Sequence, residues 1–249
     1  MWLKLNEDER HQKGRRSMRL QIHLLALMGF LLLPAYASAQ NQVATKENLD
    51  LPFDAFGISE DEEEAPEVVF FYGQQYEGDG FFFALDRSGS TRGSQIEIEK
   101  REAIRTVTQF SNRVQFGFVF YDQGILNWPG GGQPAEASQS QKTAAIAWLT
   151  SIQSGSGSCA GDGMIKALKY ADRSSAKRNV VVYLGDGGTG CPSSQTNSGS
   201  KALTNVTGAN FKRHQINSIC VGTDISQADK TFCQTLARMN GGTYKHVPN

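Results

Sequence analysis

The sequence predicts an α/β fold in which an open, mainly parallel β-sheet carries helices on both faces. Two short runs, residues 81–85 and 180–184, are continuously apolar, as strands buried on both sides are. An acidic residue follows each run, Asp86 after the first and Asp186 after the second. Stretches with apolar residues at helical spacing separate the predicted strands, and this alternation is typical of parallel sheets covered by helices.

Composition indicates a single globular domain with additional segments. The chain has 249 residues, of which 39% are apolar and 20% charged, the usual proportions for a folded domain. Basic and acidic residues balance at 25 each, so the overall charge does not favour binding to nucleic acid or to an anionic membrane surface. A partner must therefore be recognised by a local site.

Residues 1–39 have the pattern of a secretory signal peptide. Basic residues, among them Arg15 and Arg16, precede an apolar segment at 22–33, and small residues ending at Ala39 provide a cleavage site. The apolar segment is short for a membrane span, so an uncleaved anchor is the alternative interpretation. Met18 offers an alternative start of translation. We expect an exported protein, periplasmic or extracellular, that is membrane-anchored only if this segment is retained.

Residues 40–66 are expected to form a disordered linker. The segment is polar and ends in a block of like charges at residues 60–64, which cannot pack together. A tail that attracts Ca²⁺ or a partner protein is the functional alternative. The folded domain is then expected to span residues 67–249.

The first half of that domain is predicted to contain three strands and two helices. The strands are apolar or alternating runs, and the helices have apolar residues every three or four positions. Strands are expected at residues 68–71, 81–85 and 114–120, and helices at 96–110 and 145–152. Turn residues at 77–80 separate the first strand, interpreted as an edge strand, from the second.

The second half continues the same alternation after a Gly- and Ser-rich stretch at residues 154–159. Strands are expected at 180–184, 216–221 and 243–247, and helices at 164–171, 203–211 and 226–239. Ser226 is the predicted N-cap of the last helix, which ends at Asn240 and Gly241.

Oxygen-bearing side chains follow the strand at 81–85. Asp86, Ser88 and Ser90 stand at alternate positions of a tight loop and offer hard oxygen ligands, which suit Mg²⁺, Mn²⁺ or Ca²⁺. Asp186 follows the Val-rich strand, and right-handed crossovers bring such strand ends to one edge of a sheet. Ligands bind at that edge in open α/β sheets. The sequence therefore predicts a metal site there.

These residues resemble the von Willebrand factor type A family, whose metal-ion-dependent adhesion site begins with Asp-x-Ser-x-Ser. The resemblance covers residues 67–249 and implies a Rossmann-like open sheet with helices on both faces. It places Ser158 where the family usually has a threonine ligand, and Thr91 where the family often has methionine. It implies that Asp86, Ser88, Ser90, Ser158 and Asp186 hold a divalent cation, directly or through water.

The resemblance also implies a mode of action. The cation keeps an open coordination position, which a carboxylate of a partner protein fills. The protein is then a binding module and not an enzyme.

Each predicted ligand also has a purely structural interpretation. Asp86, Ser88 and Ser90 could form a strand-end turn that caps a helix, and Asp186 could begin a turn with Gly187. Ser158 could belong to a flexible loop. A scaffold domain with a vestigial metal site would follow from these interpretations.

Catalysis is a weaker interpretation. A metal-assisted phosphohydrolase could use Asp86 as nucleophile, but Ser88 stands where the second acid of such enzymes is needed. The sequence contains no Gly-x-Ser-x-Gly motif, which argues against a serine hydrolase. His214 and His246, the histidines left after signal removal, are interpreted as structural.

Four cysteines in an exported chain suggest disulfides. Cys159 and Cys191 each lie shortly after a proposed site residue, so we expect them to pair at the loop-bearing edge. Cys220, on a predicted strand, and Cys233, on the next helix, are the second expected pair, with two buried free thiols as the alternative. No Cys-x-x-Cys spacing occurs, which argues against a zinc site.

Overall fold

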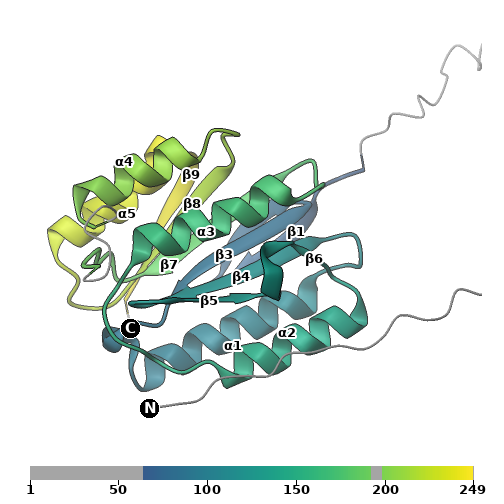
Figure 1. The fold of residues 1–249 in the computed structure, drawn as a ribbon, viewed down its shortest axis with the longest axis horizontal. Coiled ribbons are helices and arrows are strands. Elements are labelled where there is room, and N and C mark those ends of the chain that lie inside the picture. The colour runs from purple at the N-terminus through teal and green to yellow at the C-terminus, as the bar shows by residue number, and fades with distance from the viewer. Residues whose placement is uncertain (1–63, 192–197, 249) are drawn as a thin grey trace, which may run out of the picture. The chain divides into compact units, whose positions relative to one another are not determined.

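The computed structural model describes residues 64–191 and 198–248. Within these residues the chain forms nine strands and five α-helices, and the main sheet has the spatial order β5-β4-β3-β7-β8-β9, with β6 paired to β4 (Figure 1). The strands are β1 Glu67–Phe71, β2 Gln74–Gly78, β3 Gly80–Asp86, β4 Gln115–Tyr121, β5 Ile125–Trp128, β6 Ala135–Glu136, β7 Asn179–Gly185, β8 Gln215–Val221 and β9 Gly241–Val247. Strands β4, β3, β7, β8 and β9 are parallel, whereas β5 and β6 run antiparallel to β4. The predicted α/β fold with a mainly parallel sheet is confirmed.

Helices cover both faces of the main sheet (Figure 1). They are α1 Ser94–Gln109, α2 Gln139–Ser151, α3 Ala160–Arg173, α4 Ser200–Ala209 and α5 Gln227–Met239, and two 3₁₀ turns are η2 Gly89–Thr91 and η3 Gly130–Gly132. Helices α1 and α2 share one hydrophobic core with the sheet, and α3, α4 and α5 share the other. Ser226 caps α5 as predicted, since its side chain accepts from the Asp229 backbone N–H at 3.2 Å.

The aromatic run of β3 explains why this strand is central. Alternate side chains point to opposite faces of a strand, so Phe81 and Phe83 enter the core under α1 and α2, whereas Phe82 enters the core under α3. The Phe83 ring stacks on Phe118 with centroids 4.8 Å apart, and Phe82 stacks on Tyr170 at 6.5 Å. Burying each phenylalanine contributes roughly 1.5–3 kcal/mol, which fixes the register that carries Asp86 to the sheet edge.

The predicted first strand is not an edge strand of the main sheet. Strand β1 pairs antiparallel with β2, and the two form a separate two-stranded sheet that packs on the α1 side of the core. The chain reverses at Tyr72 and Gly73, both of which have positive φ. The sequence did not reveal β2 because Tyr76 is its one large apolar residue, and that side chain is buried.

Two apolar residues at the ends of predicted helices lie on the surface. The helix predicted at residues 203–211 ends earlier, since α4 ends at Ala209, and Phe211 is 71% exposed. Met239 is the last residue of α5 and is 46% exposed. Terminal turns of a helix lose the 3.6-residue register with the core, so apolar periodicity overestimates burial there.

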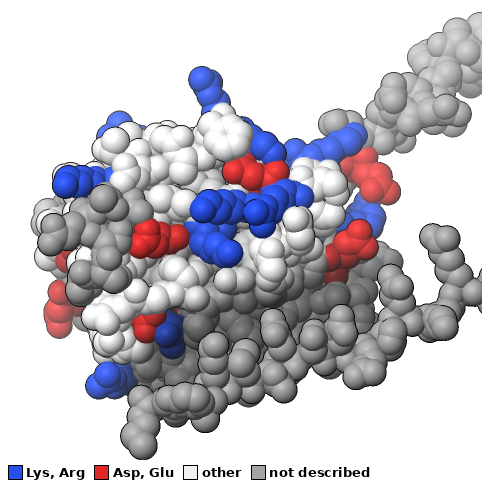
Figure 2. Space-filling model, in the orientation of Figure 1, with Lys and Arg blue, Asp and Glu red and all other residues white. Residues whose placement is uncertain are grey.

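Lys and Arg side chains gather in Figure 2 over the region where Figure 1 shows α3, with Asp and Glu side chains beside them. Helix α3 carries Lys166, Lys169 and Arg173. The Lys166 ammonium lies 5.8 Å from the centroid of the Tyr170 ring, and Arg173 donates to the Gly132 carbonyl at 2.8 Å. Arg173 therefore holds the loop that contains η3 against α3.

The signal peptide predicted for residues 1–39, and residues 40–63 of the predicted linker, lie outside the described residues. The described end of the linker is held by ion pairing, because Glu64 contacts Arg113 with an N–O distance of 2.5 Å. In the part of the chain that the structure describes, none of the helices has both the length and the apolar character needed to cross a membrane.

Candidate metal centre

The two predicted acidic ligands lie at the same edge of the sheet. Asp86 is the last residue of β3, and Asp186 immediately follows β7. These strands are parallel neighbours in register, with Leu85 opposite Leu184. Because parallel strands emerge at the same edge, the two carboxylates and the loops that follow them come together as the sequence indicated.

A chain of hydrogen bonds joins four of the five predicted ligands. The Ser88 backbone N–H donates to Asp86 Oδ1 at 2.6 Å, and the Ser88 and Ser90 hydroxyl oxygens are 2.8 Å apart. The Ser90 hydroxyl then donates to Asp186 Oδ2 at 2.7 Å. Asp86 is fully buried and Ser90 is exposed, so this chain runs from the interior to the surface.

Asp86 Oδ2 has no hydrogen-bond partner among the described residues, although it is buried. Tyr121 lies nearby, but its hydroxyl donates to the Leu184 carbonyl at 3.1 Å. Burial, followed by the charge of Asp186, raises the pKa of Asp86 from 3.8 to about 7, against the opposing effect of the Ser88 hydrogen bonds and, more weakly, of the nearby Tyr121 hydroxyl. A buried carboxylate oxygen without a donor is costly, so this position favours a proton or a cation.

The raised pKa of Asp86 predicts a specific pH dependence. Because the folded pKa lies above the unfolded value, Asp86 favours folding at low pH, and this contribution is lost as the pH rises from about 4 to about 7. Thermal melts of metal-free wild type and of Asp86→Asn should show wild type losing stability relative to the variant as the pH is raised from about 4.5 to about 8. A difference in melting temperature that stays constant over this range would contradict the assignment.

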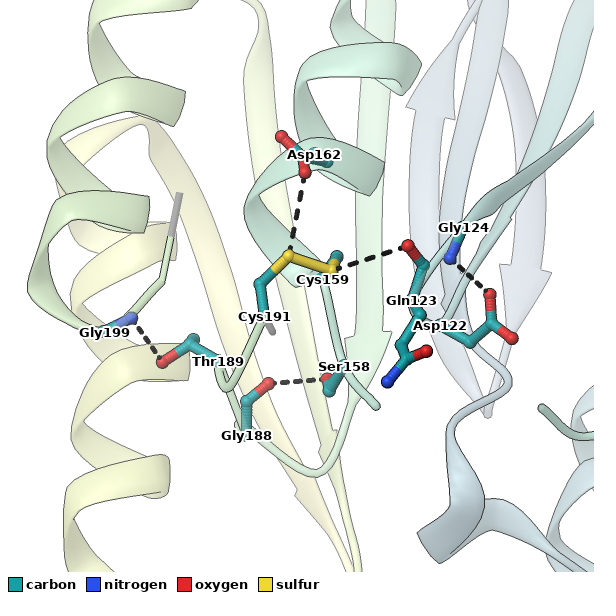
Figure 3. The surroundings of a disulfide bond; sticks show 10 residues. All are labelled: Asp122, Gln123, Gly124, Ser158, Cys159, Asp162, Gly188, Thr189, Cys191 and Gly199. Carbon is teal, nitrogen blue, oxygen red and sulfur yellow. Dashed lines mark hydrogen bonds between the residues drawn. A yellow bond between two sulfur atoms is a disulfide. The ribbon is translucent and has the colours of Figure 1, made fainter. Parts of the chain in front are cut away.

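Ser158 reaches the same edge but bonds to a neighbour of the acidic ligands. Its hydroxyl donates to the Gly188 carbonyl at 2.8 Å, and the Gly188 N–H donates to Asp186 Oδ1 at 2.8 Å (Figure 3). Ser158 is partly buried at the end of the Gly- and Ser-rich stretch. It is therefore connected to Asp186 through one intervening residue.

The disulfide predicted between Cys159 and Cys191 is present. The two Cα atoms are 4.4 Å apart, and the bond joins the loop after Ser158 to the loop after Asp186 (Figure 3). Asp162 Oδ2 lies 3.8 Å from Cys191 Sγ, so Cys159, Cys191 and Asp162 bring metal-ligand atom types together. Both sulfur atoms are used in the disulfide and carry no thiolate, so this group is not available to a metal.

The second predicted disulfide is wrong. Cys220 on β8 and Cys233 on α5 are free thiols, and both are fully buried in the core under α4 and α5. Cys220 Sγ instead lies 4.0 Å from the Asp229 carbonyl oxygen. Both cysteines pack as small apolar side chains, which was the alternative interpretation.

Two further acidic residues near the site were not predicted. Glu99 on α1 is fully buried, and burial, followed by the charges of Asp86 and Asp186, raises its pKa well above its usual range. Asp122 directly follows β4, so it is a third acid at the end of a parallel strand, and it is 6% exposed. The position of Asp122 after an apolar alternating strand is a signal that sequence reasoning could have used.

The predicted histidine roles agree with the contacts. His214 Nε2 lies 3.0 Å from Asp172 Oδ1, and His246 Nε2 lies 2.8 Å from the Gly222 carbonyl oxygen. Both rings therefore bond to groups of the scaffold and not to the Asp86 loop.

Comparisons with known proteins identify the fold. No protein-family model matches the sequence. The chain is 26% identical over 172 residues to human inter-alpha-trypsin inhibitor heavy chain H4, an alignment that covers 66% of this chain but 18% of that protein. The chain thus spans less than a fifth of the length of this relative.

Two solved structures share the architecture. A von Willebrand factor type A protein from Catenulispora acidiphila superposes with a TM-score of 0.62 at 15% identity, covering 76% of this chain and 47% of that one. The pilus adhesin SpaC from Lactobacillus rhamnosus GG gives a TM-score of 0.55 at 12% identity, covering 74% of this chain and 30% of that one. The fold is that of a von Willebrand factor type A domain.

Proposed function

We propose that this chain is a divalent-cation-dependent protein-binding module of the adhesion type. A cation held at the edge of the sheet would take an acidic group of a partner protein as its remaining ligand. The observation that carries the proposal is the buried Asp86 Oδ2, which has no partner among the described residues. The other oxygen of the same carboxylate, Oδ1, begins the chain of hydrogen bonds that runs through Ser88 and Ser90 to the surface.

The donor set fits a hard divalent cation. Ser88, Ser90 and Ser158 offer neutral oxygens, and Asp86 and Asp186 offer carboxylates, directly or through water. Mg²⁺ is preferred, with Mn²⁺ or Ca²⁺ as alternatives. Two carboxylates neutralise a divalent ion, and neutral hydroxyls leave it able to attract a further anion, such as an aspartate or glutamate of a partner.

The chain itself prepares this arrangement. The Thr91 hydroxyl donates to the Ser88 carbonyl at 2.8 Å, and the Ser88 N–H holds Asp86 Oδ1, so the loop is fixed on both sides of Ser88. Asp86 forms the floor of the site, whereas Ser90 lies at its open side. A partner carboxylate would approach from the Ser90 side, since Asp86 is inaccessible.

Binding is favoured over catalysis by the burial of Asp86. A nucleophile of a phosphohydrolase must reach its substrate, but Asp86 has no exposed surface. The solved structures of similar fold agree with an adhesion role, since SpaC is a pilus adhesin. They also favour an exported location, periplasmic or extracellular, in line with the predicted signal peptide.

Calorimetric titration of the protein with Mg²⁺ and Mn²⁺ tests this proposal. Wild type should bind one cation, and Ser88→Ala/Ser90→Ala should lose at least ~10-fold in affinity because two ligands are removed. Ser94→Ala, an exposed serine at the start of α1, is the matched control and should bind as wild type does.

Two further results would count against the proposal. Wild type that binds neither Mg²⁺ nor Mn²⁺ would leave a scaffold domain with a vestigial site. Turnover of a generic phosphate ester that disappears in Asp86→Asn would favour the phosphohydrolase instead.

A further inference from the structure

The loop that carries Ser158 rests on a third strand-end acid, Asp122. We propose that Asp122, through its ion pair with Arg87, is a positioning residue that holds Ser158 at the metal site. This inference rests on the proposed cation binding, because it assigns Asp122 a role in setting the cation affinity without making it a ligand.

Both carboxylate oxygens and the backbone carbonyl of Asp122 accept hydrogen bonds from the surrounding loops. Its Oδ1 accepts from the Gly124 N–H at 2.8 Å, and its Oδ2 accepts from the Arg87 guanidinium at 2.8 Å. The Ser156 N–H points to the same Oδ2 at 3.4 Å, and the Cys159 N–H donates to the Asp122 carbonyl at 2.8 Å. Two of these donors flank Ser158, at positions 156 and 159.

Arg87 completes the same connection from the loop that follows Asp86. Its guanidinium also donates to the Gln153 carbonyl at 2.9 Å, and its own carbonyl accepts from the Gly155 N–H at 2.6 Å. Arg87 stands between Asp86 and Ser88 in sequence. The Arg87–Asp122 pair therefore ties the Asp86 loop to the Ser158 loop.

Glycines in the Ser158 loop show how closely it packs on this pair. A Cβ atom on Gly155 would lie 1.8 Å from Asp122 Oδ2, and one on Gly157 would lie 2.5 Å from Gln123 Cγ. Gly157 also has a φ of +72°, which favours glycine. The loop can approach Asp122 at Gly155, and Gln123 at Gly157, this closely only because both residues lack a side chain.

Burial makes the pair strong enough for this role. The side chains of Arg87 and Asp122 are 17% and 9% exposed, so the pair is screened by water less than a surface salt bridge. On its other side, the loop is held by the bond from Ser158 to Gly188 and by the disulfide of Cys159. Asp122 is therefore the support of the loop on the β4 side.

Asp122→Asn tests the inference, because it keeps the volume and a Gly124 acceptor but removes the charge. In the metal-free protein, amide hydrogen exchange at Gly155, Ser156 and Cys159 should accelerate, while exchange in β3 and β7 stays unchanged. Mg²⁺ affinity should fall about 10-fold, the usual effect of losing a group that orients a metal ligand. In a Ser158→Ala background the same change should cost less than about 2-fold, because the residue it positions is gone.

The matched control is Arg178→Gln. Arg178 Nε lies 2.9 Å from Asp79 Oδ2, a more exposed ion pair at the opposite edge of the sheet, so this variant should keep wild-type Mg²⁺ affinity. Equal losses of affinity in Asp122→Asn and Arg178→Gln would overturn the inference, as would an equal loss in the presence and absence of Ser158. Unchanged exchange at positions 155–159 in Asp122→Asn would also overturn it. Wild type that binds no cation would instead refute the proposed function, and the exchange experiment would still decide whether Asp122 holds the loop.

Discussion

Replacing Asp86 by asparagine is expected to lower the affinity for Mg²⁺ by at least ~100-fold without unfolding the protein. Asparagine keeps an acceptor for the Ser88 N–H but removes one of the two negative charges at the site. A unit charge about 4 Å from another contributes about 4 kcal/mol at an effective dielectric constant of 20, which exceeds the ~2.7 kcal/mol that a 100-fold change requires. The cost falls on binding, since the neutral side chain is easier to bury than the carboxylate.

This expectation has a second part that separates a binding site from a structural turn. Asp86 is buried with one oxygen unpartnered, so metal-free Asp86→Asn should be at least as stable as wild type at pH 8. Calorimetry and thermal melting measure the two effects on the same samples. Asp162→Asn, an acid close to the disulfide but outside the predicted ligand set, is the control and should leave the cation affinity unchanged. Equal Mg²⁺ affinity in wild type and Asp86→Asn would refute the assignment of Asp86.

Removing the Cys159–Cys191 disulfide should give the largest loss of stability among the changes considered. The bond closes a loop with a sequence separation of 32 residues, and a cross-link of that size stabilises the folded state by about 3.7 kcal/mol, mainly by restricting the unfolded chain. Denaturant unfolding of Cys159→Ser/Cys191→Ser should show this decrease in the free energy of unfolding. Mg²⁺ affinity should fall as well, because Ser158 precedes Cys159 and depends on it for its position.

Chemical reduction provides the control for this prediction. A reductant should lower the unfolding midpoint of wild type to that of the double variant and leave the variant itself unchanged. Equal midpoints of wild type with and without reductant would show that the bond contributes no stability. Cys220 and Cys233 are free thiols, so reduction at these positions is not expected to contribute to the difference.

The fold and the acidic part of the site could be predicted because both depend on short local patterns. The continuous apolar run Phe81-Phe82-Phe83 indicated a strand covered on both faces, and the position of Asp86 at its end follows directly. Asp186 could be placed beside it because parallel neighbouring strands end at one edge. These inferences required no knowledge of side-chain contacts.

The remaining features depend on long-range contacts that local patterns do not encode. Strand β2 is mostly polar and forms because Tyr76 enters a core built by distant strands. Asp122 becomes important only because the loop at residues 153–159 folds back onto it. Cys220 and Cys233 lie on adjoining elements, but this proximity did not determine whether they pair.

Anomalous X-ray scattering from crystals of the protein grown with Mn²⁺ tests the central claim most directly. We predict one strong Mn²⁺ peak at the carboxyl edge of β3 and β7, within bonding distance of the Ser88 and Ser90 hydroxyl oxygens and beside Asp86. A structure at saturating Mn²⁺ without a peak at this edge, or with its strongest peak elsewhere, would contradict the account.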